Sequence, residues 1–176
     1  MKTKVLSLLM AAVILFGAMT VPAAAQTKEK SYNLTTVSGI TAAQLAKYMH
    51  PETRHLAGHV VRICEREGVS AEFIAAVMRW ERRPDLHNYF GWTNYRGRLM
   101  RFENDVACLE RVIPLIKKCY LTPNGKYFNG YTVEAVSIYY NNSEFWRDTI
   151  KAETMRILEG EQNEKRIRKP ITKQEA

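Results

Sequence analysis

The segment from Ser70 to Glu81 reads SAEFIAAVMRWE and has the pattern of a buried helix. Ser70 is a favoured helix N-cap, and Gly68, two residues earlier, is a favoured end for the preceding helix. Phe73, Val77 and Glu81 recur at intervals of four, so they lie on one helix face. A carboxylate therefore ends an apolar stripe in the last turn of this helix.

Two effects disfavour the ionised form of the Glu81 carboxyl. The apolar stripe desolvates it, and the negative end of the helix dipole lies beside it. A carboxyl that stays protonated near neutral pH can donate a proton to a leaving oxygen, as in glycoside hydrolysis. Arg79, Arg82 and Arg83 favour the alternative, a solvated and salt-bridged residue at a helix end. Both interpretations stay open at this point.

Helix signals recur on both sides of this segment, so the sequence predicts a mostly α fold. Thr41, Asn104, Thr132 and Ser143 precede helical patterns as N-caps, and Pro51 opens another helix. Pro114 predicts a kink or a break in the helix that follows Asn104. The expected helices cover residues 42–49, 51–66, 71–82, 105–120, 133–140 and 144–160.

An irregular, aromatic stretch follows the Glu81 helix. Residues 84–92 read PDLHNYFGW, and residues 93–102 alternate around Arg96-Gly97, which predicts a short β-hairpin. Sugar rings stack on exposed aromatic surfaces, although about half of these side chains should pack the core instead. The first aromatic group is Trp80, Tyr89, Phe90, Trp92 and Tyr95, and the second is Tyr139, Tyr140 and Trp146.

The N-terminus has the order of an export signal. Lys2 and Lys4 precede an apolar run, and Ala23-Ala24-Ala25 offers a small-residue cleavage site. The apolar run is short for a membrane anchor, which needs about 20 residues. We expect a signal peptide over 1–25, a linker over 26–40, one domain over 41–161 and a basic, disordered tail over 162–176. The protein is then a secreted monomer, extracellular or associated with the cell wall, with no stable membrane span.

The chain has 26 Lys and Arg against 18 Asp and Glu, a net charge of +8. In an exported protein this charge favours anionic cell-wall polymers, reached through the basic tail, over nucleic acid, although solubility alone also explains it. His55 and His59 have a zinc-compatible spacing but no third ligand, so we expect neither metal nor cofactor. Three cysteines are too few for a disulfide scaffold: Cys64 could pair with Cys108 or Cys119, or all three could be thiols.

Residues 52–160 resemble the glucosaminidase domain of bacterial autolysins, glycoside hydrolase family 73 of the lysozyme-like superfamily. Residues 68–76 resemble the family's turn into its catalytic helix, and Glu81 falls where the family places its general acid. Asn88-Tyr89-Phe90-Gly91 is similar to the family's Asn-x-Phe-Gly loop. Tyr140, with Trp146 six residues later, resembles the family's tyrosine-containing late helix.

The resemblance implies a lysozyme-like helical domain (α+β) with a small β-hairpin lobe. It also implies a secreted peptidoglycan hydrolase that cuts the glycan strand as an endo-β-N-acetylglucosaminidase. Glu81 would be the general acid, Glu103 or Asp105 the second carboxylate, and Tyr140 the residue that positions the sugar. The expected substrate-binding residues are Asn88, Tyr89, Phe90, Trp92, Tyr95 and Tyr139.

Two alternatives remain. A lytic transglycosylase of the same fold would use a single Glu as acid and base. The family also usually has a longer stretch with Gly and Ser between its acid and the Asn-x-Phe-Gly loop, whereas only seven positions separate Glu81 from Asn88. Arg82-Arg83-Pro84 replaces the usual small residues there. A degenerate wall-binding module without turnover is therefore the second alternative.

Overall fold

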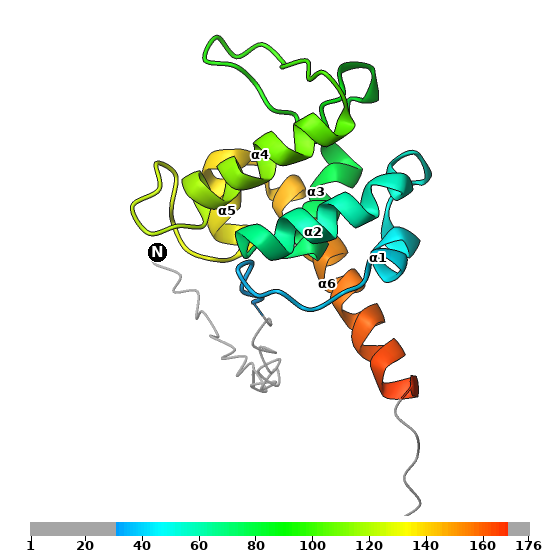
Figure 1. The fold of residues 1–176 in the computed structure, drawn as a ribbon. Coiled ribbons are helices and arrows are strands. Elements are labelled where there is room, and N and C mark those ends of the chain that lie inside the picture. The colour runs from blue at the N-terminus through cyan, green and yellow to red at the C-terminus, as the bar shows by residue number, and fades with distance from the viewer. Residues whose placement is uncertain (1–30, 169–176) are drawn as a thin grey trace, which may run out of the picture. The chain divides into compact units, whose positions relative to one another are not determined.

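The computed structural model describes residues 31–168, and this part of the chain is mostly helical, as expected (Figure 1). Residues 1–30 and 169–176, which include the expected signal peptide and the end of the basic tail, lie outside the described residues. The elements are α1 (Ala42–Tyr48), η1 (Pro51–Leu56), α2 (Ala57–Glu67), α3 (Ala71–Glu81), η2 (Pro84–Leu86), α4 (Asp105–Tyr120), α5 (Val133–Tyr140) and α6 (Glu144–Arg168).

Helix α3 is the centre of the fold. Its residues from Ala71 to Met78 are all buried, and it packs against α1, α2 and α6. Apart from Glu72, this buried stretch is apolar, and an apolar helix is stable only when other elements cover it, which explains why the neighbouring helices surround this one. Burial ends at Arg79, so the last turn of α3 carries Glu81 out of the core toward the surface.

Local capping fixes where the central helices begin and end. Gly68 has the left-handed conformation (φ 63°) that closes α2. The Ser70 hydroxyl accepts a hydrogen bond from the Phe73 amide at 3.1 Å and starts α3. Asn104 and Thr132 cap α4 and α5 in the same way. The helix starts predicted from these residues are therefore confirmed.

The segment expected to be a linker is part of the fold from residue 31 onward. Leu34 is fully buried, its amide donates to the Tyr131 carbonyl, and its carbonyl accepts from the Ser70 amide. Ile40 is also buried in the core. Tertiary packing of these apolar side chains outweighs the polar composition that suggested a linker, so the folded unit includes residues 31–40.

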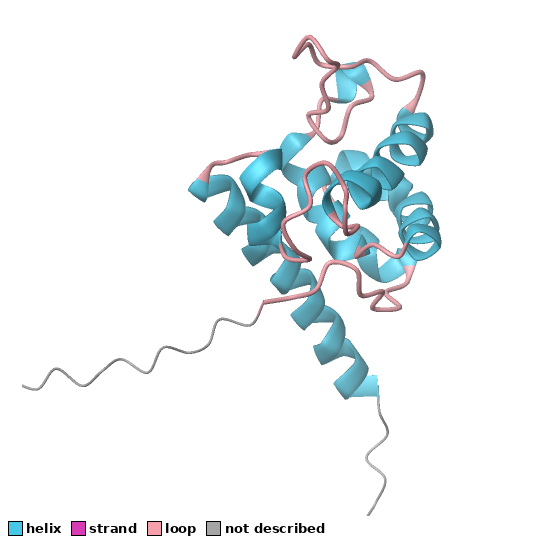
Figure 2. Ribbon diagram, turned by 90° about the vertical axis from the view of Figure 1, so that its left-hand side faces the viewer, coloured by secondary structure: helices cyan, strands magenta, loops and turns pink. Residues whose placement is uncertain are grey.

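Residues 82–104, here called the lobe, connect α3 to α4 and project from the helical body (Figures 1 and 2). The expected β-hairpin is reduced to one bridge between Thr93 and Leu99, beside a tight turn at Asn94. A second bridge joins Arg83 to Asn88. No longer strand forms anywhere in residues 31–168, because Gly97 and the polar residues around it leave few side chains to pair.

Two helices are more continuous than the sequence suggested. Pro114 lies inside α4, which remains one helix because an apolar face from Cys108 to Ile116 packs against α2. Helix α6 runs past Gly160, its expected end, to Arg168, so the first part of the expected tail is helical. Gly160 acts as a packing glycine there, since the Tyr48 ring occupies the space of its missing Cβ. Helix α6 extends beyond the other helices in both ribbon views (Figures 1 and 2).

The remaining helical segment differs from expectation at its start. Pro51 opens the 3-10 helix η1, and α2 begins only at Ala57, where one helix over 51–66 was expected.

Cys64, Cys108 and Cys119 are free thiols. In the part of the chain that the structure describes, no helix is both long and apolar enough to cross a membrane.

Candidate functional site

The Glu81 carboxylate is held at the carboxyl end of α3 by a residue from α6. The indole Nε1 of Trp146 donates a hydrogen bond to Oε1 of Glu81 at 2.6 Å. Trp146 is 6% exposed, whereas Glu81 is half-buried, so the carboxylate reaches the surface from a supported position. A hydrogen bond to a charged or acidic group in such a setting is shorter and stronger than a neutral one.

The shortened segment after Glu81 folds back on itself. Arg83 and Asn88 exchange two backbone hydrogen bonds of 2.6 and 3.0 Å around η2. The chain then returns to the acid, where Gly91 lies against Glu81. A Cβ at Gly91, whose φ is 58°, would lie 2.5 Å from Oε2 of Glu81. The seven-position spacing therefore still brings the Asn-Tyr-Phe-Gly loop to the carboxylate.

Asn88 holds the lobe together from inside. It is fully buried, its Nδ2 donates to the Trp92 and Met100 carbonyls at 2.9 Å, and its Oδ1 accepts from the Phe90 and Trp92 amides. An amide that uses both ends on backbone groups has no capacity left for a ligand. In the structure Asn88 therefore supports the backbone of the lobe, whereas the sequence suggested that it binds substrate.

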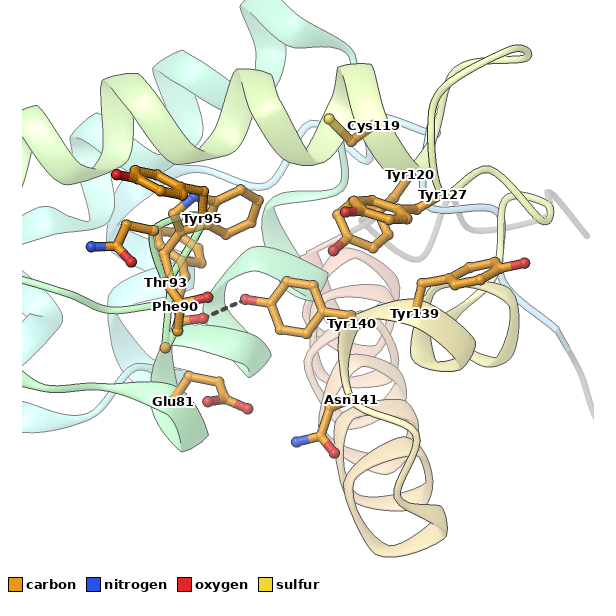
Figure 3. Close-up of a pocket in the computed structure, with 13 residues that line it drawn as sticks. Glu81, Phe90, Thr93, Tyr95, Cys119, Tyr120, Tyr127, Tyr139, Tyr140 and Asn141 are labelled. Carbon is orange, nitrogen blue, oxygen red and sulfur yellow. Dashed lines mark hydrogen bonds between the residues drawn. The ribbon is translucent and has the colours of Figure 1, made fainter. Parts of the chain in front are cut away.

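Tyr140 connects α5 to the lobe and to the Glu81 support. Its hydroxyl donates to the Phe90 carbonyl at 2.6 Å (Figure 3), and its ring stacks on Trp146 at 5.2 Å between centroids. Burial, and then the nearby Glu81 carboxylate, raise the pKa of the Tyr140 phenol well above its usual value. The phenol therefore stays a hydrogen-bond donor at any physiological pH.

A cleft of about 540 Å³ opens beside these residues. Its walls come from the lobe, the end of α4, the loop after α4 and the end of α5, and Figure 3 shows Glu81 and Asn141 at one end with tyrosines along the other walls. Aromatic and small polar side chains dominate the lining. It consists of Glu81, Phe90, Gly91, Trp92, Thr93, Asn94, Tyr95, Cys119, Tyr120, Tyr127, Tyr139, Tyr140 and Asn141.

Most of the residues predicted to bind substrate line this cleft. Tyr95 and Tyr139 are 89% and 56% exposed, so each presents a ring to solvent at the cleft edge. Trp92 and Phe90 also line the cleft. Tyr89 does not line it, because its side chain is 3% exposed and belongs to the core. Rings that stay exposed beside a carboxylate are available to stack on a ligand.

Sequence reasoning missed two tyrosines of the cleft wall. Tyr120 ends α4, and Tyr127 follows in the next loop, with ring centroids 5.2 Å apart. Burial, with the neighbouring Tyr127 as a smaller cause, raises the pKa of Tyr120 to about 12. The signal that could have found Tyr127 is its place between two turn sequences, Asn124-Gly125 and Asn129-Gly130, which mark a surface loop.

Neither candidate for the second carboxylate lines the cleft. Glu103 is exposed on the lobe. The carboxylate of Asp105, at the start of α4, is hydrogen-bonded to His87 Nδ1 at 2.5 Å and to His55 Nε2 at 3.3 Å. Burial raises the pKa of Asp105, but hydrogen bonds from His87, Tyr89 and His55 outweigh it, and the pKa is lowered overall. Sequence position alone could not show that Asp105 faces the histidines.

Those histidines surround a second, separate cavity of about 290 Å³. His59 also lines it, and its Nδ1 atom is buried without a hydrogen-bond partner. Burial, followed by the hydrogen bond to Asp105, raises the pKa of Tyr89, which joins this cluster from the lobe. Over residues 31–168, no group of three or more His, Cys, Asp or Glu side chains is arranged to hold a metal ion.

No protein-family model matches the chain, and no curated protein shows significant similarity to it. A function for the chain must therefore be inferred from the cleft itself.

Proposed function

We propose that the protein is a secreted glycosidase that cleaves the glycan strand of peptidoglycan, with Glu81 as general acid. One observation carries this proposal: the half-buried Glu81 carboxylate stands at one end of a tyrosine-lined cleft of about 540 Å³, fixed by the Trp146 indole. Aromatic walls suit the apolar faces of sugar rings, and a positioned carboxyl suits protonation of a glycosidic oxygen. This arrangement fits the lysozyme-like class suggested by the resemblance to family 73.

The hydrogen bond from Trp146 indicates which carboxyl oxygen would carry the proton. An indole N–H only donates, so Oε1 must be an acceptor in both protonation states of Glu81. A carbonyl oxygen is a better acceptor than a hydroxyl oxygen, so we expect the proton of the acid form on Oε2, the oxygen nearest Gly91. Because Gly91 has no Cβ, its backbone can lie close to Oε2 without displacing the carboxyl group.

Tyr140 acts in this proposal as a positioning residue. Its hydroxyl is already engaged with the Phe90 carbonyl, and its ring supports Trp146, so it sets the distance between the lobe and the acid. The exposed rings of Tyr95 and Tyr139 are the better candidates for direct contact with sugars. Stacking of this kind provides affinity, whereas the acid provides the rate.

A lytic transglycosylase is the second candidate, and the lining of the cleft favours it. Glu81 is the one carboxyl among the described residues that line the cleft, whereas hydrolysis by two enzyme carboxylates needs a second. In a transglycosylase, the acid protonates the leaving oxygen, and the resulting carboxylate then takes the proton of the sugar's own hydroxyl as that hydroxyl attacks the anomeric carbon. The product is an anhydro sugar, and no water is consumed.

Digestion of purified peptidoglycan tests the proposal. Wild type should release soluble fragments, and Glu81→Gln should reduce the rate about 10²- to 10⁴-fold, the range for loss of a general acid. Asp105→Asn and Glu103→Gln are matched controls that should retain most of the activity, because neither side chain lines the cleft. Equal activity of Glu81→Gln and wild type would remove Glu81 from the mechanism.

Mass spectrometry of the products separates the candidates. Reducing ends at N-acetylglucosamine indicate glucosaminidase activity, and anhydro ends indicate a transglycosylase. Binding to walls without any soluble product would identify a non-catalytic module and overturn the proposed enzyme.

A further inference from the structure

The lobe carries an excess of positive charge that the rest of the protein does not neutralise. Its 23 residues contain five arginines against two acidic residues, Asp85 and Glu103. Arg82 contacts Glu52 at 3.5 Å. The other four are exposed, and none forms an ion pair with a residue that the structure describes: Arg83, Arg96, Arg98 and Arg101.

Two of these arginines, Arg96 and Arg98, belong to the same turn as Asn94 and Tyr95, which line the cleft. Arg96 and Arg98 flank the turn in which Asn94 Oδ1 accepts hydrogen bonds from both of their amides, at 2.9 and 3.2 Å. Asn94 and Tyr95 line the cleft, and the Arg96 guanidinium lies 5.2 Å from the centre of the Tyr95 ring. The Arg96 charge thus lies over one face of the exposed Tyr95 ring in the cleft wall.

Exposed charges of one sign create a local potential that attracts ligands of the opposite sign. The ligand that occupies the cleft would reach Arg96 and Arg98 if it carries anionic branches close to its sugar rings. Peptide stems, which bear carboxylates and hang directly from the glycan of peptidoglycan, have that chemistry. Guanidinium groups match carboxylates in geometry and form paired hydrogen bonds with them.

We propose that Arg96 and Arg98 form a subsite for the carboxylates of peptide stems, so that the cleft selects glycan strands that carry stems over bare ones. This inference rests on the proposed function for its ligand and extends it from a sugar polymer to an anionic, peptide-bearing one. It also moves the expected contact with wall polyanions from the C-terminal tail to the lobe.

Binding to insoluble wall material tests the subsite without any need for turnover. In a Glu81→Gln background, Arg96→Gln/Arg98→Gln is compared with Arg54→Gln/Arg111→Gln, which removes the same charge from exposed arginines outside the lobe. The three substrates are walls stripped of teichoic acid, the same walls after carbodiimide and ammonia have converted the stem carboxylates to neutral amides, and walls that retain teichoic acid.

The Arg96→Gln/Arg98→Gln variant (the lobe pair) should bind stripped walls about 3- to 10-fold more weakly at low salt. The Arg54→Gln/Arg111→Gln variant (the control pair) should show little change. The difference should shrink as salt is raised and disappear on walls whose stem carboxylates have been amidated. Equal losses for both pairs, or a lobe effect that persists on amidated walls, would overturn the subsite. A lobe effect confined to walls with teichoic acid would overturn the carboxylate assignment in favour of phosphate.

The two proposals fail in different ways. Loss of wall binding in the lobe pair, with no fragments released by wild type, supports the subsite and contradicts the enzyme. Fragment release by wild type, together with unchanged wall binding by the lobe pair, supports the enzyme and contradicts the subsite.

Discussion

Trp146 Nε1 and Glu81 Oε1 lie 2.6 Å apart, although 65 positions separate the two residues in the chain. The bond joins the end of α3 to the first turn of α6, and the Trp146 ring also stacks on Tyr140. The orientation of the candidate acid is therefore set by a residue from another helix.

Trp146→Phe should lower kcat on peptidoglycan about 10- to 100-fold, because a hydrogen bond to an acidic group contributes roughly 1.5–3 kcal/mol. A phenyl ring can keep part of the stack on Tyr140 but cannot donate to Glu81. Trp80→Phe is the matched control, since Trp80 is adjacent to Glu81 yet 50% exposed and packed on Phe145. Similar kcat values for wild type and Trp146→Phe, measured where circular dichroism shows both folded, would contradict this role.

Gly91→Ala should abolish most of the activity. A Cβ there would lie 2.5 Å from Glu81 Oε2 and push the carboxylate from its place, and a displacement near 1 Å can cost about 10²-fold in rate. Gly97→Ala is an informative control because Gly97 has a similar positive φ, 71°, but nothing within 4 Å of its missing Cβ. Backbone strain is thus common to both variants. If both lose activity equally, strain in the lobe and not contact with Glu81 is the cause.

The starts of α3, α4 and α5 could be predicted from the sequence because N-capping is local. Ser70, Asn104 and Thr132 each satisfy an amide three residues later, so a short window of sequence contains all the information needed. The placement of Glu81 at the end of an apolar stripe was predictable for the same reason.

What could not be predicted depends on contacts between distant segments. Leu34 is buried in the core and its backbone is hydrogen-bonded to Ser70 and Tyr131, and Asp105 faces His55 and His87. Gly160 looked like a helix end, yet the helix continues because Tyr48 packs on it. In each case local propensity suggests one outcome and tertiary packing imposes another, which no single window of sequence can show.

Gly160→Ala should destabilise the fold by about 1–3 kcal/mol, despite the better helix propensity of alanine. The new Cβ would overlap the Tyr48 ring, which must then move from its place between α1 and α6. Gly58→Ala, in a helical position with nothing within 4 Å, should instead stabilise by about 0.5–1 kcal/mol. Urea unfolding of both variants measures the difference, and a gain in both would show that the Tyr48 ring yields freely.

The three thiols should differ in reactivity. Burial raises the pKa of Cys108 to about 12 and raises that of Cys64 further, and both side chains are buried. Thiolate is the reactive form, so neither should react with a disulfide reagent at pH 8 while the protein is folded. Cys119 is partly accessible in the cleft wall, so one thiol should react quickly and Cys119→Ser should abolish that phase. Fast reaction of more than one thiol in the native protein would contradict the burial of Cys64 in α2 or of Cys108 in α4.

The free energy of unfolding should fall as pH rises above 10. Burial raises the pKa of both Tyr32 and Tyr120 from the usual 10.0 to about 12. Between pH 10 and 12 the native state therefore binds more protons than the unfolded chain, and stability declines with pH across that window. Below pH 10 both states are protonated and these phenols add no slope. Tyr120→Phe should flatten the decline in urea unfolding, whereas Tyr95→Phe, which removes a phenol that is 89% exposed, should not. An unchanged slope in Tyr120→Phe would show that this phenol ionises as freely in the folded protein as in the unfolded chain.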